Sequence, residues 1–289
     1  MLWDGLIAPF AEFGFLRRAL VGCLALSLSA PPLGVFLMLR RMSLAGDALS
    51  HGILPGVALA FVLGGLWAPG LALGGLLAGL LIALGSGAIA RGTGGREDAA
   101  LAGLYLTALA AGVAIISWRG SAVELTQLLF GSVLGVDDAA LLLMAASATA
   151  TLVFLAIAWR PLVLECFDPS FARAVGVRGS LWHLLLLATV VLNLVAAFQA
   201  VGSLMAVGLM MLPAVAARHW ARSIGGMAQA AAGLAVVESL LGLLFSFHAD
   251  VPSGPAIVLA AALFWAVSLV FGPVDGLLVR LRPRRHLSG

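Results

Sequence analysis

Apolar stretches long enough to cross a lipid bilayer follow one another along almost the whole chain of 289 residues. A membrane-spanning helix needs about 20 mostly apolar residues, and nine stretches meet or approach that length. The boundary between the sixth and seventh is the least sharply marked, because residues 181–219 form either two short crossings or, in part, a discontinuous helix. The predicted spans are 15–39, 48–66, 69–91, 98–118, 138–160, 181–201, 203–219, 226–247 and 254–272.

The composition agrees with a membrane protein. Hydrophobic residues make up 62% of the chain and charged residues 10%, whereas soluble domains carry about 25% charged residues. We therefore expect an all-α, polytopic transmembrane helix bundle of eight or nine spans that forms one domain over residues 1–289. The glycine pairs at 70 and 74 and at 75 and 79 have the spacing of close helix packing, for which we favour the inside of the bundle over a dimer contact.

The arginines predict the orientation in the membrane. All sixteen basic residues are arginine, and arginine gathers on the cytoplasmic side of membrane proteins. An outer N-terminal segment (1–14) and a cytoplasmic C-terminal tail (273–289) put thirteen of them inside and only Arg17, Arg18 and Arg119 outside. The inner arginines are Arg40, Arg41, Arg91, Arg96, Arg160, Arg173, Arg178, Arg218, Arg222, Arg280, Arg282, Arg284 and Arg285. The cluster in the tail suits anionic lipid better than nucleic acid.

Enzyme signatures are missing from the sequence. It contains no GxxxxGK[ST] phosphate loop, no HExxH zinc-protease pair and no GxSxG nucleophile elbow. Cys23 and Cys166 lie in different segments and form no CxxC motif. We expect a protein that is not an enzyme and that holds no permanent cofactor.

Asp47 and His51 are the most informative polar residues, because they lie at the start of a predicted span. At positions i and i+4 they share one helix face, and a carboxylate with an imidazole suits zinc or manganese. The spacing leaves a second interpretation open, in which Asp47 caps the helix and His51 is a packed, hydrogen-bonded histidine.

Other ionisable residues near membrane depth are weaker metal-ligand candidates: Glu238 within the eighth span, and His248 and Asp250 after its end. Glu238 could instead bond to a neighbouring helix, which we favour, line a path or relay protons. Asn193 and Gln199 are expected to form hydrogen bonds between helices.

The loop 165–178 predicts a short helix on the arginine-rich side. Asp168 followed by Pro169 is typical of an N-cap and a first helical position, and Gly176 suits the end of the helix. Phe171, Ala172 and Val175 are expected to form an apolar face. Such a helix either docks on a cytoplasmic partner or lies on the membrane surface.

Three segments, in this order, closely resemble the membrane permease subunits of bacterial zinc/manganese ABC importers, the ZnuB-like family. They are "LRRMSLAGDALSHGILPGVALAFVLG" (39–64), "FDPSFARAVGV" (167–177) with "VGSLMAVGLMMLPAVAARHWAR" (201–222), and "SFHADVPSGPAIVLAAALFW" (246–265). The segment "LFGSVLGVDD" (129–138) is also similar to that family. The resemblance extends over nearly the whole chain, from about residue 17 to 272.

The resemblance implies a type II-like ABC importer permease in the bacterial inner membrane. It implies a homodimer that works with two copies of a cytoplasmic ABC ATPase and with an extracytoplasmic metal-binding protein. It makes Asp47 and His51 ligands of the transported Zn²⁺ or Mn²⁺, with zinc slightly favoured, and makes 165–178 the coupling helix that docks on the ATPase. The coupling residues are then Asp168, Pro169, Phe171, Ala172, Arg173, Val175 and Gly176.

Two rival functions are open at this point. One is a permease for a metal chelate, of the siderophore or cobalamin importer type, although the Gly-Asp-Ala-Leu-Ser-His segment favours a bare ion. The other is a proton-coupled secondary transporter in which Glu238 carries protons. Uptake that depends on ATP and on a co-purifying ATPase would separate the second from an ABC importer.

Overall fold

The computed structural model describes residues 8–65, 67–119 and 136–281. All the regular secondary structure in these ranges is helical, so the predicted all-α class is confirmed. The helices are α2 (Ala8–Glu12), α3 (Gly14–Leu39), α4 (Ala45–Gly52), α5 (Leu54–Gly64), α6 (Ala68–Thr93), α7 (Glu97–Arg119), α9 (Asp138–Phe167), α10 (Pro169–Ala174), α11 (Gly179–Val201), α12 (Ser203–Ala217), α13 (Ile224–Ala249), α14 (Ser253–Phe271) and α15 (Leu277–Leu281).

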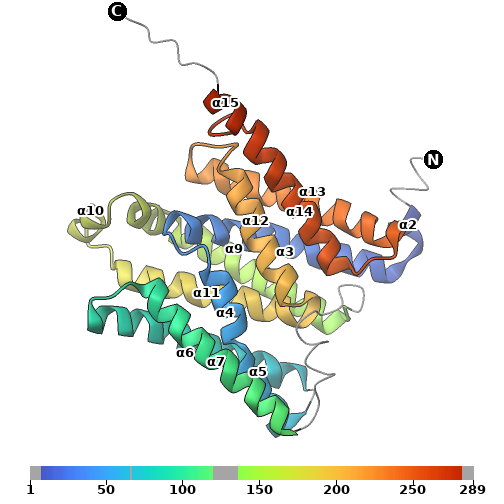
Figure 1. Cartoon of the computed structure of the whole chain (residues 1–289), viewed down its shortest axis with the longest axis horizontal. Coiled ribbons are helices and arrows are strands. Elements are labelled where there is room, and N and C mark those ends of the chain that lie inside the picture. Colours follow the sequence, from blue (N-terminus) through green and yellow to red (C-terminus); the bar gives the residue numbers. More distant parts are fainter. Residues whose placement is uncertain (1–7, 66, 120–135, 282–289) are drawn as a thin grey trace, which may run out of the picture.

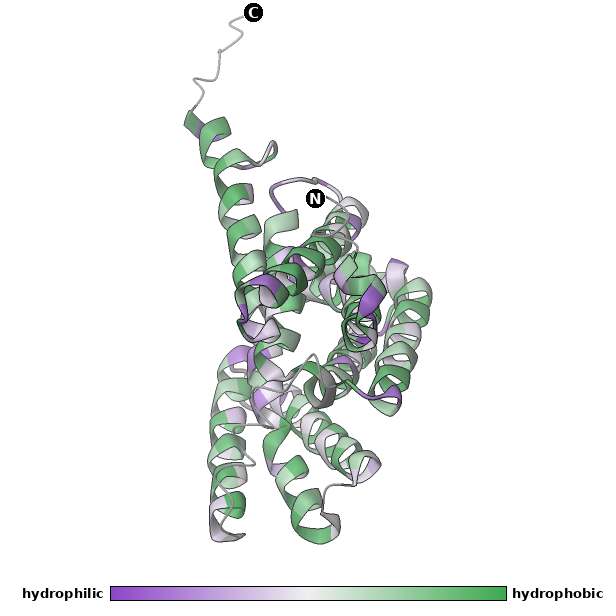
Figure 2. Ribbon diagram, turned by 90° about the vertical axis from the view of Figure 1, so that its right-hand side faces the viewer, coloured by the Kyte–Doolittle hydropathy of each residue, from purple (hydrophilic) through white to green (hydrophobic). Residues whose placement is uncertain are grey.

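Eight segments in the described ranges are long and apolar enough to cross a membrane, and α12 is a shorter apolar helix of 15 residues. The predicted boundary between the sixth and seventh spans is confirmed at Gly202, whose φ of 83° is in the left-handed region. Glycine adopts that backbone conformation without a steric penalty, so α11 ends there and α12 begins in a new direction. Figure 2 shows mostly hydrophobic ribbon along the long helices.

The second predicted span (48–66) is present as the apolar segment Ala45–Gly64, but it is not one continuous helix. It begins earlier, at Ala45, and is interrupted at Ile53 between α4 and α5. Pro55 explains the interruption, because proline has no N–H to bond the carbonyl of His51 and its ring crowds that carbonyl.

The fifth span is longer than predicted. Helix α9 continues past residue 160 to Phe167 and has 30 residues. At 1.5 Å per residue it is about 45 Å long, more than the hydrocarbon thickness of about 30 Å. Its last turns therefore carry α10 beyond the bundle, and α10 projects at the left edge of Figure 1.

Two groups of helices make up the bundle (Figure 1). Helix α3 packs against α9, α12 and α13, and α14 packs on α12 and α13. Helices α5, α6 and α7 pack on one another in the second group. Helix α4 lies between the groups, against α6, α7, α11 and α12.

Glycine allows the closest approach within the second group. A Cβ atom at Gly74 of α6 would collide with the carbonyl oxygen of Gly56 in α5, and one at Gly56 would collide with the carbonyl oxygen of Gly74. A Cβ atom at Gly75 would collide with the side chain of Ile53, and one at Gly79 would collide with the side chain of Val191. The prediction that this glycine spacing serves packing inside the bundle is confirmed at these three positions of α6.

Several sequence-based predictions fall on residues outside the described ranges. They concern residues 1–7 of the N-terminal segment, 129–135 of the fourth similar segment and 282–289 of the tail.

Candidate metal site

The pair Asp47 and His51 lies on α4, in the span interrupted by Pro55. Leu44 is the N-cap of α4, and no side chain in the described part of the chain makes a capping hydrogen bond there. Asp47 is in the first turn, where a negative charge interacts favourably with the helix dipole. The alternative in which Asp47 caps the helix is therefore wrong.

The two side chains point toward each other. Asp47 Oδ1 lies 3.6 Å from His51 Nε2, slightly beyond a normal hydrogen bond. Two ligand atoms that share one ion at about 2.1 Å each stand roughly 3.0–3.4 Å apart. A small closing movement of either side chain would thus allow both atoms to bind the same divalent ion.

Tyr105 of α7 is the aromatic neighbour of the His51 imidazole. The rings of His51 and Tyr105 are stacked, with centroids 6.5 Å apart and an interplanar angle of 28°. His51 Nδ1 is buried and has no hydrogen-bond partner in the described part of the chain, so Nε2 is the nitrogen presented to Asp47. Sequence reasoning missed Tyr105, and the one available signal was that it is the single tyrosine of the chain.

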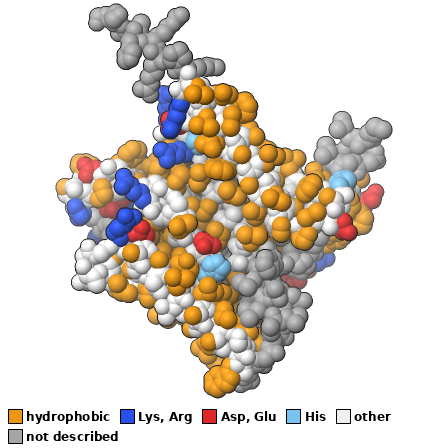
Figure 3. Space-filling view, viewed as in Figure 1, with side chains coloured by type: hydrophobic (Ala, Val, Ile, Leu, Met, Phe, Trp, Pro, Cys, Tyr) orange, Lys and Arg blue, Asp and Glu red, His pale blue; other side chains and the backbone are white. Residues whose placement is uncertain are grey.

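The pair is accessible from outside the chain, with 54% of the Asp47 side chain and 31% of the His51 side chain exposed. In Figure 3 an acidic and a histidine side chain lie together on a largely hydrophobic face, over the position of α4 in Figure 1. The described residues contain no group of three or more His, Cys, Asp or Glu side chains that could hold a metal ion. One chain therefore offers an ion two such ligands at this position.

Glu238 is completely buried in α13, and neither carboxylate oxygen has a hydrogen-bond partner among the described residues. Its neighbour Ser239 does bond across to Ser27 of α3, with 3.1 Å between the hydroxyl oxygens. The expectation that Glu238 bonds to a neighbouring helix is wrong for the described residues, among which the adjacent Ser239 makes the interhelical contact.

His248 and Asp250 lie at the C-terminal end of α13. His248 is exposed, and its Nδ1 donates to the carbonyl oxygen of Leu244 at 2.8 Å. Asp250 is the C-cap of α13, with a φ of 54°. The structure does not bring Glu238, His248 and Asp250 together with Asp47 and His51 in one cluster of the described chain.

The predicted interhelical role of Asn193 is confirmed. Its Nδ2 donates to Ser29 Oγ of α3 at 3.0 Å and to Thr151 Oγ1 of α9 at 3.3 Å. This bond set joins α11 to two other helices. The side chain of Gln199 lies outside the described part.

The short helix after α9 forms as predicted. Asp168 is its N-cap and accepts hydrogen bonds from the backbone N–H groups of Ser170 and Phe171, both at 2.9 Å. Pro169 occupies the first turn, and Gly176 follows the helix with a φ of 84°.

The predicted apolar face of α10 is wrong in one respect. Ala172 is fully buried, whereas Phe171 and Val175 are 54% and 52% exposed. Adjacent residues point about 100° apart around a helix, so Ala172 anchors α10 to the bundle while Phe171 and Val175, one turn apart, face outward. Arg173 is also exposed and bonds to Ser170 Oγ at 3.3 Å.

Comparison with known proteins places this arrangement in a family. The model of the ABC 3 transport family matches residues 12–272. The manganese import system permease protein ScaB of Streptococcus parasanguinis is 35% identical over 91% of this chain and 92% of its own length. The manganese transport system membrane protein MntC of Halalkalibacterium halodurans is 33% identical over 93% and 91%.

A relative named for iron is similar to this chain over a comparable share of its length. The chelated iron transport system membrane protein YfeD of Yersinia pestis is 33% identical over 95% of this chain and 91% of its own length. Among solved structures, PsaBC from Streptococcus pneumoniae in complex with Fab superposes with a TM-score of 0.84 at 32% identity, covering 97% of this chain and 99% of that one. The chain belongs to the ABC 3 transport family and is a membrane permease of the metal ABC transporter type.

Proposed function

We propose that this chain is the permease subunit of an ABC importer that carries Mn²⁺ across the bacterial inner membrane by alternating access. The observation that carries the proposal is the Asp47–His51 pair, accessible on α4 with 3.6 Å between its facing atoms. The sequence slightly favoured zinc, but the names of the relatives ScaB and MntC support manganese. Carboxylate and imidazole ligands are compatible with both ions.

The exposure of the pair supports a homodimer. An aspartate that faces lipid in a membrane-spanning segment is costly, so such residues normally face a bundle interior or a water-filled cavity. A second copy of the chain that covers α4 would remove the pair from lipid and add a second carboxylate and imidazole. Together with water, these groups would replace part of the hydration shell of Mn²⁺ while still letting the ion leave.

Helix α10 is the proposed contact with the ATPase. Phe171 of α10 and Val175, the residue directly after it, are half-exposed on a helix end that projects from the bundle. Exposed apolar anchors at helical spacing fit a groove on a partner protein. We assign α10 to the cytoplasmic side, with two ATPase copies on the dimer, and the opposite side to an extracytoplasmic metal-binding protein that delivers the ion.

The orientation follows from the arginines. An outer N-terminus and a cytoplasmic C-terminal tail put the arginine-rich loops inside. With Cys23 and Cys166 replaced by serine, labelling of single cysteines introduced at Glu12 and Asp275 with an impermeant thiol reagent would test this. Labelling from outside is expected at position 12 only, and labelling at position 275 in intact cells would refute it.

The metal assignment is tested in vesicles that contain the permease, the ATPase and the metal-binding protein. Asp47→Ala and His51→Ala should each reduce ATP-dependent ⁵⁴Mn²⁺ uptake to near background while the complex still assembles. His248→Ala is the matched control, because His248 is an exposed histidine outside this pair, and it should transport normally. Normal uptake by both α4 variants would refute the assignment.

A metal chelate is the second candidate cargo, because the similar protein YfeD is named for chelated iron. The same vesicles can be offered free Mn²⁺ or a ferric chelate. We expect uptake of the free ion only, since the two facing ligands suit a bare cation. Membership of an ABC transporter family argues against a proton-coupled transporter. Uptake without ATP hydrolysis would support the proton-coupled transporter instead.

A further inference from the structure

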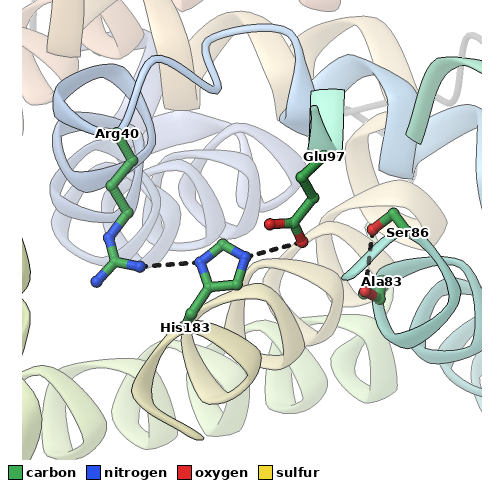
Figure 4. A network of polar contacts seen from close by, with 5 residues as sticks. All are labelled: Arg40, Ala83, Ser86, Glu97 and His183. Carbon is green, nitrogen blue, oxygen red and sulfur yellow. Dashed lines mark hydrogen bonds and ion pairs between the residues drawn. The ribbon is translucent and has the colours of Figure 1, made fainter. Parts of the chain in front are cut away.

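His183 of α11 links Arg40, at the end of α3, to Glu97, at the start of α7 (Figure 4). Arg40 Nη1 lies 2.9 Å from His183 Nδ1, and His183 Nε2 lies 2.9 Å from Glu97 Oε1. A guanidinium has only donors, so Nδ1 must accept and the ring proton must be on Nε2. His183 is therefore a neutral bridge that accepts from Arg40 and donates to Glu97.

The bridge is largely shielded from solvent. The side chain of His183 is 13% exposed and that of Glu97 is 25% exposed. Hydrogen bonds to charged groups are stronger than neutral ones, and shielding reduces competition from water. The three side chains are thus suited to move as one unit.

One side of the bridge leads to the metal pair. Arg40 is the C-cap of α3, directly before the short turn that enters α4. Glu97 is the first residue of α7, and Tyr105 lies about 12 Å further along that helix, where it stacks on His51. A shift of His183 would act on α4 through its entry turn and on the imidazole through α7.

The other side leads to α10. Only residues 175–178 separate α10 from α11, and this link is tied back to α10 by the bond from Val177 N–H to the Ala172 carbonyl oxygen at 2.9 Å. A cavity of about 570 Å³ is lined by Arg40, Glu97, His183 and also by Pro169, the first residue of α10. The cavity leaves room for α10 and the bridge to move relative to each other.

We propose that His183 is a positioning residue that transmits movement of α10 to the Asp47–His51 pair through Arg40 and Glu97. The inference rests on the proposed function, because it takes α10 as the ATPase contact. In this mechanism the imidazole of His183 holds both Arg40 and Glu97, so a movement of α10 reaches α4 and α7 together. The ATPase step and the exposure of the metal pair therefore change together. Loss of the bridge should leave ATP hydrolysis running without matching metal transport.

The test measures Mn²⁺ taken up per ATP hydrolysed in vesicles that contain the whole transporter. His183→Phe keeps a ring but removes both hydrogen bonds, and should lower the ratio at least about five-fold, the low end of coupling between sites. His183→Gln offers one acceptor and one donor and should restore most of it. Thr189→Val on the same helix removes a bond within α11, from Thr189 Oγ1 to the Leu185 carbonyl oxygen, and should leave the ratio unchanged.

A merely structural role for His183 would lower uptake and ATP hydrolysis in proportion and leave the ratio of Mn²⁺ to ATP unchanged. An unchanged ratio would overturn the inference. If His183→Phe does not fold, Glu97→Ala takes its place, because it removes the bond between Glu97 and His183. A normal ratio of Mn²⁺ to ATP in Glu97→Ala would also overturn the inference. Failure of the wild-type vesicles to transport Mn²⁺ would instead refute the proposed function, so the two failures are distinguishable.

Discussion

Asp168 offers a sharp test of how α10 is held in shape. The helix has only six residues, and isolated helices of that length are unstable in water. Two backbone N–H groups, of Ser170 and Phe171, bond to one carboxylate oxygen of Asp168 at 2.9 Å. The Asp168→Ala variant leaves both donors without this acceptor, while Ala172 remains to anchor the helix by burial.

The loss of an N-cap costs about 0.5–2 kcal/mol. Such a cost lowers the equilibrium constant for the ordered helix by roughly two- to thirty-fold, and the ordered population by about two- to fifteen-fold when order and disorder are otherwise balanced. We expect ATP-dependent Mn²⁺ uptake by Asp168→Ala to fall by a factor in this range. The affinity of the detergent-solubilised permease for its ATPase, measured by titration, should fall by a similar factor.

Asp168→Asn separates capping from charge. Asparagine caps helices about as well as aspartate, but it carries no charge to pair with an ATPase residue. We expect uptake within about two-fold of the wild-type value, because cap preferences of Asn and Asp are nearly equal. If Asp168→Asn is as inactive as Asp168→Ala, the capping argument is refuted and the carboxylate must act by its charge.

Three further predictions concern stability and can be measured by thermal unfolding in detergent. Asn193→Leu removes the bonds to Ser29 and Thr151; at about 0.6 kcal/mol each the Tm should fall by about 2–4 °C, and an unchanged Tm would contradict this. Glu238→Gln should keep or raise the Tm, because a buried carboxylate with no hydrogen-bond partner among the described residues is costly to ionise; a fall of more than about 4 °C would show that the carboxylate holds a charged partner. Burial lowers the pKa of His219, in the turn after α12, so the unfolded chain takes up a proton near pH 6.5 before the folded chain does. Stability should therefore decline as the pH falls through about 6.5, and His219→Gln should remove that part of the decline; an identical pH profile in the variant would refute the assignment.

Much of the site was predictable because it is local. The i, i+4 spacing of Asp47 and His51 depends only on helix geometry, and the Asp-Pro N-cap of α10 depends on two adjacent residues. The interruption at Ile53 was missed because the apolar pattern continues through Pro55. Hydropathy reports on the membrane environment and not on the backbone bond that proline removes.

The sequence alone determined that this chain crosses the membrane many times, which residues are candidate cation ligands and where the short projecting helix begins. Those properties follow from composition and from neighbours within one or two helical turns. Only the tertiary structure decided that Tyr105 stacks on His51, that Glu238 has no hydrogen-bond partner among the described residues, and that His183 joins Arg40 to Glu97. His183 is 143 and 86 residues from those partners, and contacts at such separations exist only once the packing of the helices brings the side chains together.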